Sequence, residues 1–437
     1  MPDLRPFQVI LIGVFIALAV GGLIAFSVFR GFGTEENPYG ARVVIWGTLD
    51  GSAFSATIRE LTEADEQFGV VSYVQKDPRT FSAELANAIA EGRGPDAVVL
   101  SNDLLLSERA KLYAIPYESF SQRAIRDTYV DGAEIFSRGA GTYGFPFAVD
   151  PLVLYWNRDV LASAGFAAPP STWETLVFSY VPALTRIEQV PAYTVSRATV
   201  AFGGCQNVTH AREVLLALML QAGSTLVTER GGGYIAALNQ AAGEAPRPPA
   251  DAALDFYTQF SNPARTTYTW NRSLPTDRSA FLSEDLALYF APGSEHESLR
   301  AGNPNLNFDI AEIPQGSGVS TKRGFGTFYA LAPLSSSKNF TGTYQALVTL
   351  ASPAPAALLA ERLDMAPVHR ATLAGGSADP FRQRAYTAAL IARGFLDPDS
   401  TRSGGIIQAM IEDVTSSRVR IDQAVSDATT RLNQLLR

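Results

Sequence analysis

Polar residues follow two of the strands that the sequence predicts, at the positions where those strands end. The apolar run at residues 42–46 is followed by a short loop, and the run at residues 95–100 is followed by Ser101 and further polar residues. In open α/β sheets, ligands collect at the carboxyl ends of strands, near a switch in strand order. The residues there that can hydrogen-bond a small solute are Thr48, Asp50, Asn102 and Asp103.

Asp150 is another candidate carboxylate, and it directly precedes Pro151 and the apolar run at residues 152–156. Carboxylates suit polyhydroxylated solutes, since they accept bidentate hydrogen bonds from neighbouring hydroxyls and form stronger bonds than neutral acceptors do. Asp50 with Gly51, and Asp150 with Pro151, are also good turn sequences. Ligand contact and turn structure therefore both remain open for these two aspartates.

Common catalytic and cofactor-binding patterns are missing from the sequence. There is no Ser/His/Asp order, H-E-x-x-H motif or P-loop, and no G-x-G-x-x-G turn follows the first strand, so neither a catalytic residue nor a cofactor is predicted. The single cysteine, Cys205, excludes an internal disulfide, and the three histidines lack metal-ligand spacing, so no metal is predicted. A net charge of −8 argues against nucleic acid as a partner.

The first part of the chain alternates predicted strands with amphipathic helices. Strands at residues 42–46, 70–75 and 95–100 are separated by helices at residues 55–68 and 81–90. This βαβαβ order forms a parallel sheet with right-handed crossovers. A chain of 437 residues exceeds one hydrophobic core, so two α/β lobes are expected.

The middle of the chain combines an apolar helix with glycine-rich segments. Residues 208–221 predict a helix that is apolar on most sides. Residues 203–207 form a backbone-permissive loop before it, in which Asn207 is a candidate for ligand contact. Residues 231–250 begin with three glycines and contain several prolines, which predicts a mobile loop.

Residues 7–29 form an uncharged, mostly apolar run of about 23 residues, which is long enough to span a bilayer as a helix. A signal peptide has a shorter apolar region that ends in small residues, whereas this run ends with Phe29 and Arg30, and no cysteine follows for a lipid anchor. We therefore predict a single-pass anchor at residues 1–30 and a tether at residues 31–40, with the remainder extracytoplasmic at the cell membrane. A cleaved signal peptide and a buried core helix are the alternatives.

Residues 143–176 carry the most specific pattern in the chain. A glycine and proline turn leads into a strand, a short helix follows, and a second helix opens with the capping box Ser171-x-x-Glu174. This order resembles the segment in which extracellular solute-binding proteins of family 1, the sugar-binding, maltose-type branch, pass from their first lobe into their second. An ordinary αβ segment of an unrelated enzyme is the alternative. The resemblance is carried by Gly144, Pro146, Asp150, Asn157, Arg158, Asp159, Pro170, Thr172, Trp173, Glu174 and Leu176.

The resemblance covers about residues 42–437 and implies an α/β, two-lobed periplasmic-binding-protein-like fold of type 2 with interleaved lobes. It implies a first lobe of residues 41–148 and 285–326, and a second lobe of residues 149–284 and 327–437. Residues 143–150 and 324–332 would then be two connections that act as a hinge.

The resemblance also implies where a sugar would bind. Asp50 and Asp150 lie where maltose-type proteins place carboxylates on sugar hydroxyls. Where those proteins carry stacking tryptophans, this chain has Leu100, Ser294 and Ile406, which favours a smaller sugar, another polyol or another small solute over malto-oligosaccharide. Candidates for stacking on a sugar, each of which could instead pack in the core, are Trp46, Trp270, Phe290, Phe328 and Tyr329.

The expected function is capture of a small solute between the lobes and its delivery to the permease subunits of an ABC importer, by a monomer and without catalysis. Two alternatives remain. One is a solute-sensing ectodomain that acts with a membrane signalling partner. The other is an anchored glycoside hydrolase in which Asp50 and Asp150 form the carboxylate pair.

Overall fold

The structure, a computed structural model, describes residues 37–139, 141–188, 194–241, 243 and 247–436. The predicted anchor at residues 1–30 and the first part of the predicted tether lie outside the described residues. Within the described ranges, no helix is long and apolar enough to cross a membrane. The end of the predicted tether belongs to the folded body, because the ring of Tyr39 packs edge-on against Phe68 at 5.0 Å and its carbonyl accepts a hydrogen bond from Asn339.

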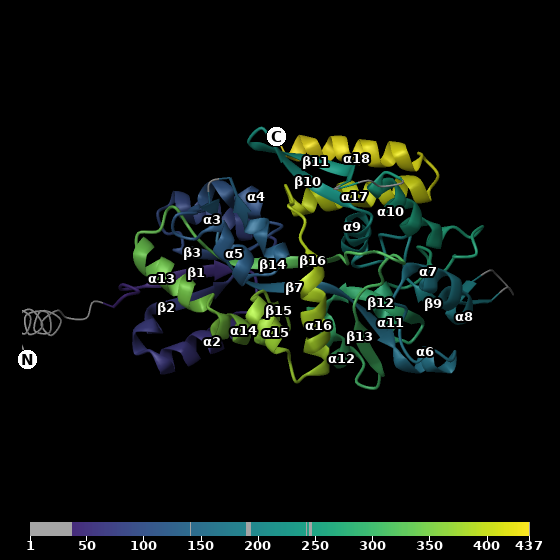
Figure 1. Cartoon of the computed structure of the whole chain (residues 1–437), viewed down its shortest axis with the longest axis horizontal. Helices are drawn as coiled ribbons and strands as arrows, with labels where there is room; N and C mark the ends of the chain where they lie inside the picture. The colour runs from purple at the N-terminus through teal and green to yellow at the C-terminus, as the bar shows by residue number, and fades with distance from the viewer. Residues whose placement is uncertain (1–36, 140, 189–193, 242, 244–246, 437) are drawn as a thin grey trace, which may run out of the picture.

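One eleven-stranded sheet runs through the whole molecule, with the strand order β2-β1-β3-β14-β7-β12-β9-β8 (Figure 1). Strands β13 and β15 pair with β7, and β16 pairs with β14. The strands are β1 (Val43–Gly47), β2 (Val71–Gln75), β3 (Ala97–Ser101), β7 (Phe145–Asn157), β8 (Arg186–Glu188), β9 (Thr194–Val200), β12 (Leu286–Pro292), β13 (Phe308–Ala311), β14 (Gly324–Pro333), β15 (Ala366–Pro367) and β16 (Ala392–Arg393). A separate small sheet contains β4 (Ile115–Pro116), β5 (Ser137–Arg138) and β6 (Gly141–Thr142).

The predicted βαβαβ unit is present. Strand β1 pairs in parallel with both β2 and β3, and the crossovers contain α2 (Gly51–Ala64) and α3 (Phe81–Ala90). Alternate residues of β1 are buried because its side chains point to opposite faces of the sheet.

The first lobe consists of residues 37–148 and 329–391, at the left in Figure 1. Its second piece enters through the end of β14, where Tyr329–Pro333 pairs antiparallel with β3. Leu347 and Leu359 then pack in one core with Ile45 and Phe54. The helices of this lobe besides α2 and α3 are α4 (Leu105–Glu108), α5 (Gln122–Thr128), α13 (Phe340–Leu350), α14 (Pro353–Arg362), α15 (Arg370–Gly375) and α16 (Pro380–Ile391).

The second lobe consists of residues 152–326 and 400–436. Strand β12 pairs antiparallel with the end of β7 and parallel with β9, and its side chains share a core with Trp156, Trp173 and Met410. The helices of this lobe are α6 (Arg158–Ser163), α7 (Trp173–Thr175), α8 (Val181–Leu184), α9 (Ala211–Gln221), α10 (Pro249–Thr258), α11 (Asp277–Leu282), α12 (His296–Gly302), α17 (Ser400–Thr415) and α18 (Ile421–Leu435).

These pairings correct the expected lobe boundaries. Residues 285–326 were expected in the first lobe, but β12 and β13 both pair with the second-lobe half of β7. Residues 327–391 were expected in the second lobe, but β14 runs into the first lobe and α13 and α14 pack on its core. The lobes are interleaved as expected, although the pieces are exchanged differently.

The chain crosses between the lobes three times, whereas the sequence predicted two connections. Strand β7 leads into the second lobe and β14 returns. After α16, which packs against the cores of both lobes, β16 pairs with the start of β14 and the chain passes into α17. The helix α16 therefore stands beside the hinge, between the lobes in Figure 1.

A β-hairpin extends from the second lobe where a mobile loop was expected. Strand β10 (Ser224–Arg230) pairs antiparallel with β11 (Gly233–Ala241). Gly231 and Gly232 form the turn between them with φ values of 61° and 81°, which glycine adopts without steric cost. The hairpin lies under α18, whose Asn433 accepts a hydrogen bond from the amide of Ala236 at 2.8 Å (Figure 1).

Candidate functional site

Asp150 lies in the middle of β7, where this strand passes between the lobes, and it pairs with Thr327 of β14. Its buried side chain accepts two hydrogen bonds from Ser294, one from the backbone amide at 3.1 Å and one from the hydroxyl at 2.5 Å. Burial raises the pKa of Asp150 to about 6, although the Ser294 hydrogen bonds lower it. The hinge therefore contains a carboxyl group whose charged form is poorly solvated.

Glu295 follows Ser294 and gathers three partners within the second lobe. Nε2 of His210 lies 2.5 Å from Oε1, the hydroxyl of Tyr289 donates to Oε2 at 3.0 Å, and Nε of Arg278 lies 3.5 Å from Oε2. Burial alone would lower the pKa of His210, but its hydrogen bond with Glu295 and the charge of Glu295 raise it. His210 and Glu295 both act electrostatically on Asp150, so this cluster adjoins the hinge carboxyl group.

Asp103 follows β3 and brings a first-lobe carboxyl group to the junction. The charges of Arg212 and Glu213, at the start of α9 in the second lobe, and of Asp397, in the third crossing, act on it. Arg212 forms ion pairs with Asp397 and, at 3.2 Å, with Glu213. Burial raises the pKa of Asp103 to about 6, with Arg212 opposing that effect. Asp103 therefore faces groups of the second lobe across the junction.

Tyr329 of β14 lies close to both junction aspartates. Burial raises the pKa of its hydroxyl, and the negative charges of Asp150 and Asp103 add to that effect. The side chain is half-buried. Tyr329 is therefore the aromatic candidate that interacts electrostatically with the carboxyl groups at the junction.

Asn102 lies at the junction, but its side chain forms hydrogen bonds within the protein. Its side-chain amide donates to the carbonyl of Phe395 at 2.7 Å, and its oxygen accepts from the amide of Phe328 at 2.7 Å. These bonds tie the third crossing to β14. Phe328 itself is completely buried in the first-lobe core, so the expectation that it stacks on a sugar is wrong for this structure.

Three further candidates lie at the end of β1 and in the loop that follows it, and two of them have structural roles. Asp50 is exposed and caps α2, accepting a hydrogen bond from the amide of Ala53 at 3.1 Å. Trp46 packs against the first-lobe core with the Lys76 ammonium 3.8 Å from its ring centre. Thr48 is half-buried between them. Because Asp50 serves as a helix cap, the structure gives no support to a catalytic pair of Asp50 with Asp150.

The second-lobe candidates also belong to the core or to its loops. Trp270 is only 1% exposed and donates from Nε1 to the side-chain oxygen of Asn207 at 3.2 Å. Asn207 in turn donates to the carbonyl groups of Asn271 and Leu274. Phe290 is buried against Trp173 and Phe202. The stacking role expected of Trp270 and Phe290 is wrong for this structure, since neither ring has a free face.

Several junction residues were not proposed as ligand contacts from the sequence, although Ser294 was noted at a position where maltose-type proteins carry a tryptophan. They are His210, Arg212, Glu213, Ser294, Glu295 and Asp397. Two of their locations carry a signal, because the polar residues at positions 210–213 open a predicted apolar helix and those at positions 295–297 follow a predicted apolar strand. Their partners are 85 and 185 residues away in sequence. No local pattern predicts which of these segments meet.

The β10–β11 hairpin spans the junction at another point. Arg109 of the first lobe donates to the hydroxyl of Tyr234 at 3.4 Å. The Arg109 guanidinium lies 5.8 Å from the ring of Tyr234 and 5.9 Å from the ring of Tyr143. Val227 and Tyr234 of the hairpin also pack against the first-lobe core. The lobes are therefore in contact beyond the hinge.

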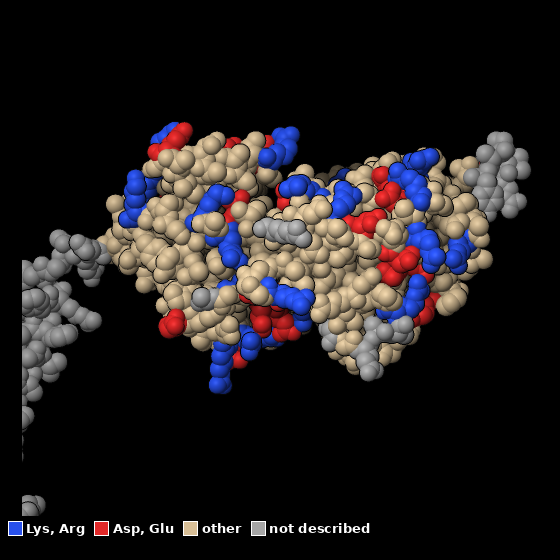
Figure 2. All heavy atoms as spheres, turned by 90° about the horizontal axis from the view of Figure 1, so that it is seen from above, with Lys and Arg blue, Asp and Glu red and all other residues tan. Residues whose placement is uncertain are grey.

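The junction offers hydrogen-bonding and ionic groups. Among the described residues, no group of three or more histidine, cysteine, aspartate or glutamate side chains is placed to hold a metal ion. On the face shown in Figure 2, charged side chains of both signs are spread over both lobes, including the middle of the molecule. The arrangement can hold a polar solute through carboxylate, hydroxyl and guanidinium groups.

Two α/β lobes, joined by three crossings that converge on polar residues, define the class of two-lobed, periplasmic-binding-protein-like binding proteins. Residues 56–356 match the family described as bacterial extracellular solute-binding protein, and the chain belongs to this family. The family and the solved structures below are binding proteins, and its members act outside the cytoplasm. Among curated proteins, no sequence matches the chain.

Solved structures share this fold over nearly their whole length. The sugar-binding protein MalE from the phytopathogen Xanthomonas citri has a TM-score of 0.71 at 18% identity, with 90% of this chain and 97% of that chain covered. The cyclic α-maltosyl-1,6-maltose-binding protein from Arthrobacter globiformis has a TM-score of 0.72 at 15% identity, with 90% and 98% covered. An ABC transporter solute-binding protein from Thermotoga lettingae, bound with α-D-tagatose, has a TM-score of 0.65 at 17% identity, with 91% and 100% covered. At these identities the similarity shows the fold.

Proposed function

We propose that the protein captures a small polyhydroxylated solute, a sugar or another polyol, between its lobes and delivers it to an ABC importer. The observation that carries the proposal is that Tyr329 interacts electrostatically with both Asp103 of the first lobe and Asp150 of the crossing strand. Arg212 of the second lobe acts on Asp103, and His210 of the second lobe acts on Asp150. A solute bound there contacts both lobes. Such a solute favours the closed arrangement, because its full set of contacts exists only when the lobes are together.

The charges at the junction support a neutral, hydroxyl-rich solute. Glu295 is accompanied by His210 and Arg278, whereas neither Asp103 nor Asp150 forms an ion pair among the described residues. Unpaired carboxylates favour hydroxyl donors and disfavour anionic solutes, because like charges repel. The similar proteins from Xanthomonas citri and Thermotoga lettingae are named as a sugar-binding protein and as a protein bound with a sugar, which agrees with this choice.

The β10–β11 hairpin contributes to lobe closure independently of the solute. Its contact with Arg109 and the first-lobe core exists only while the lobes are close. This contact adds to the stability of the closed arrangement without touching the solute. The free energy that the solute must supply for closure is smaller by the same amount.

We further propose that residues 7–29 anchor a monomeric protein in the cell membrane. An anchored binding protein stays near its permease at a high effective concentration, which raises the rate of productive encounters. Carbonate extraction of membranes tests this proposal, since an uncleaved anchor keeps the protein in the membrane fraction. A mature protein that begins between residues 25 and 40 would overturn it.

A thermal-shift screen of the purified protein against neutral sugars and polyols tests the function. A solute that binds the folded state raises the midpoint of unfolding by mass action. We expect at least one neutral sugar or polyol to raise it, and the rise to disappear in Asp150→Ala when compared at equal concentration. A screen in which only anionic solutes, or none, raise the midpoint would contradict the proposal.

A further inference from the structure

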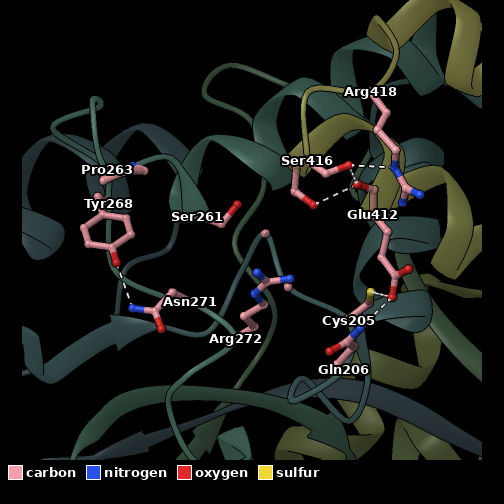
Figure 3. A pocket seen from close by; sticks show the side chains of 13 residues that line it. Cys205, Gln206, Ser261, Pro263, Tyr268, Asn271, Arg272, Glu412, Ser416 and Arg418 are labelled. Carbon is pink, nitrogen blue, oxygen red and sulfur yellow. Dashed lines mark hydrogen bonds between the residues drawn. The ribbon is translucent and has the colours of Figure 1, made fainter.

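A pocket lies within the second lobe, apart from the lobe junction (Figure 3). It has a volume of about 550 Å³, which is within the range of small-molecule sites. Its walls come from the loop at residues 203–206, the segment at residues 261–272, and the end of α17 with the turn that follows it. It shares no lining residue with the cluster around Asp103 and Asp150, so it is a separate feature of the surface.

The walls of this pocket are fixed by buried interactions. The hydroxyl of Tyr257 donates to the carbonyl of Gly204 at 2.6 Å. Gly203 has a φ of 84°, and a Cβ there would lie 2.7 Å from the backbone and side chain of Ser261, so only glycine fits. On the other side, Asn207 holds the loop that carries Asn271 by donating to its carbonyl at 3.0 Å. The pocket is therefore a defined part of the fold.

Free hydrogen-bond donors line the pocket. The guanidinium of Arg272 extends into it (Figure 3), and this side chain forms no hydrogen bond or ion pair in the part of the chain that the structure describes. The backbone amides of residues 203–206 likewise donate no hydrogen bond among the described residues. A planar guanidinium and consecutive free amides are the groups with which proteins hold oxyanions.

Glu412 also lines the pocket, and its hydrogen bonds with neighbouring side chains hold its pKa below the ordinary value, so it keeps its charge. One oxygen of Glu412 accepts hydrogen bonds from Gln206 at 3.1 Å, from Gln408 at 3.0 Å and from the thiol of Cys205 at 3.5 Å. Burial and the charge of Glu412 raise the pKa of Cys205 to about 12, so the thiol adds no negative charge. Arg418, also in the lining, pairs with Asp413 at 3.0 Å. Arg272 is left as the cation available to a ligand.

We propose that this pocket binds the carboxylate or phosphate group of a small free solute through Arg272 and the amides of residues 203–206. The proposal does not depend on the identity of the solute at the lobe junction. It assigns the protein a second ligand of opposite chemistry, an oxyanion rather than a neutral polyol. Because Arg272 is exposed and makes no described contact, its replacement should leave the fold unchanged.

Isothermal titration of the full-length protein in low-salt buffer tests the proposal, with inorganic phosphate in one arm and citrate in the other. We expect saturable binding of at least one anion, weakened about tenfold or more in Arg272→Ala, as for loss of a hydrogen bond to a charged group. Saturation by phosphate alone identifies a phosphate site, and saturation by citrate alone identifies a carboxylate site. Binding should weaken with added salt.

Two control variants make the result specific. Arg265→Ala removes an exposed arginine of the same segment that does not line the pocket, and it should bind the anion within twofold of the parent. Asp150→Asn changes the lobe junction and should also leave anion binding unchanged. Absence of saturable binding by either anion, or equal affinity in Arg272→Ala and the parent, would overturn the proposal.

Discussion

Replacement of Asp150 by asparagine should stabilise the protein at neutral pH. Burial raises the pKa of this carboxyl group from 3.8 to about 6. At about 1.4 kcal/mol per pKa unit, the ionised form destabilises the folded state by about 3 kcal/mol relative to the protonated form. Asparagine is neutral and can keep both contacts with Ser294, because a hydroxyl donates and accepts hydrogen bonds.

The raised pKa determines how the stability difference between the parent and Asp150→Asn changes with pH. A carboxyl group whose folded-state pKa is raised contributes stability that is fully present below its unfolded pKa and is lost as the pH rises through its folded pKa. For Asp150 this window extends from about pH 4 to about pH 6. The asparagine variant should therefore match the parent near pH 4 and exceed its free energy of unfolding by up to about 3 kcal/mol at pH 8.

Urea denaturation of the parent and of Asp150→Asn between pH 4 and pH 8 measures this difference. Asp127→Asn is the matched control, because the Asp127 side chain is 70% exposed and its charge is solvated. The control should shift the free energy of unfolding by less than about 0.5 kcal/mol. A variant less stable than the parent at pH 8, or a difference that does not change with pH, would refute the reasoning. The same variant should bind the junction solute more weakly, so stability and function would move in opposite directions.

Three further changes test the other assignments. Asp50→Ala removes the cap of α2 and should lower the free energy of unfolding, measured by urea denaturation, by about 0.5–2 kcal/mol. Solute affinity should stay within twofold of the parent, and a large loss of affinity would show that Asp50 contacts the solute. Trp270→Ala should cost about 3–5 kcal/mol, as for a large buried side chain, and a normal unfolding midpoint would show that Trp270 is not core. Arg109→Ala removes a cation between two tyrosine rings, worth about 0.5–2 kcal/mol, so small-angle scattering should show a larger radius of gyration without solute; an unchanged radius would exclude the hairpin contact as a determinant of closure.

Local patterns predicted much of the fold because strands and helices leave periodic signals. The runs at residues 42–46 and 70–75 correspond to β1 and β2, and the crossing at residues 324–333 is β14. The hairpin was missed because the glycines of its turn are also typical of a loop. The apolar residues after the turn indicate a strand only when the partner strand is known. Those residues, from Tyr234 to Ala237, have their partners in β10.

Lobe membership could not be predicted in the same way. Strand β12 is apolar throughout and would fit the interior of either lobe, and only its pairing with β7 and β9 decides between them. The residues of the candidate site could not all be predicted, for the same reason. Asp103 and Asp150 carried a signal because they follow or interrupt strands, whereas Arg212 is paired with a residue 185 positions later. Contacts of that range depend on the whole topology.

The interleaving of the lobes has a consequence for how the chain folds during synthesis. The first lobe needs residues 329–391 for its core, and the second needs residues 400–436, whose Ile406, Met410 and Val425 pack among its buried residues. Neither lobe can complete its core until most of the chain has been made, so the first half of the chain does not form a stable lobe during synthesis. The second lobe completes its core last, because α17 and α18 are the last elements of the chain to be made.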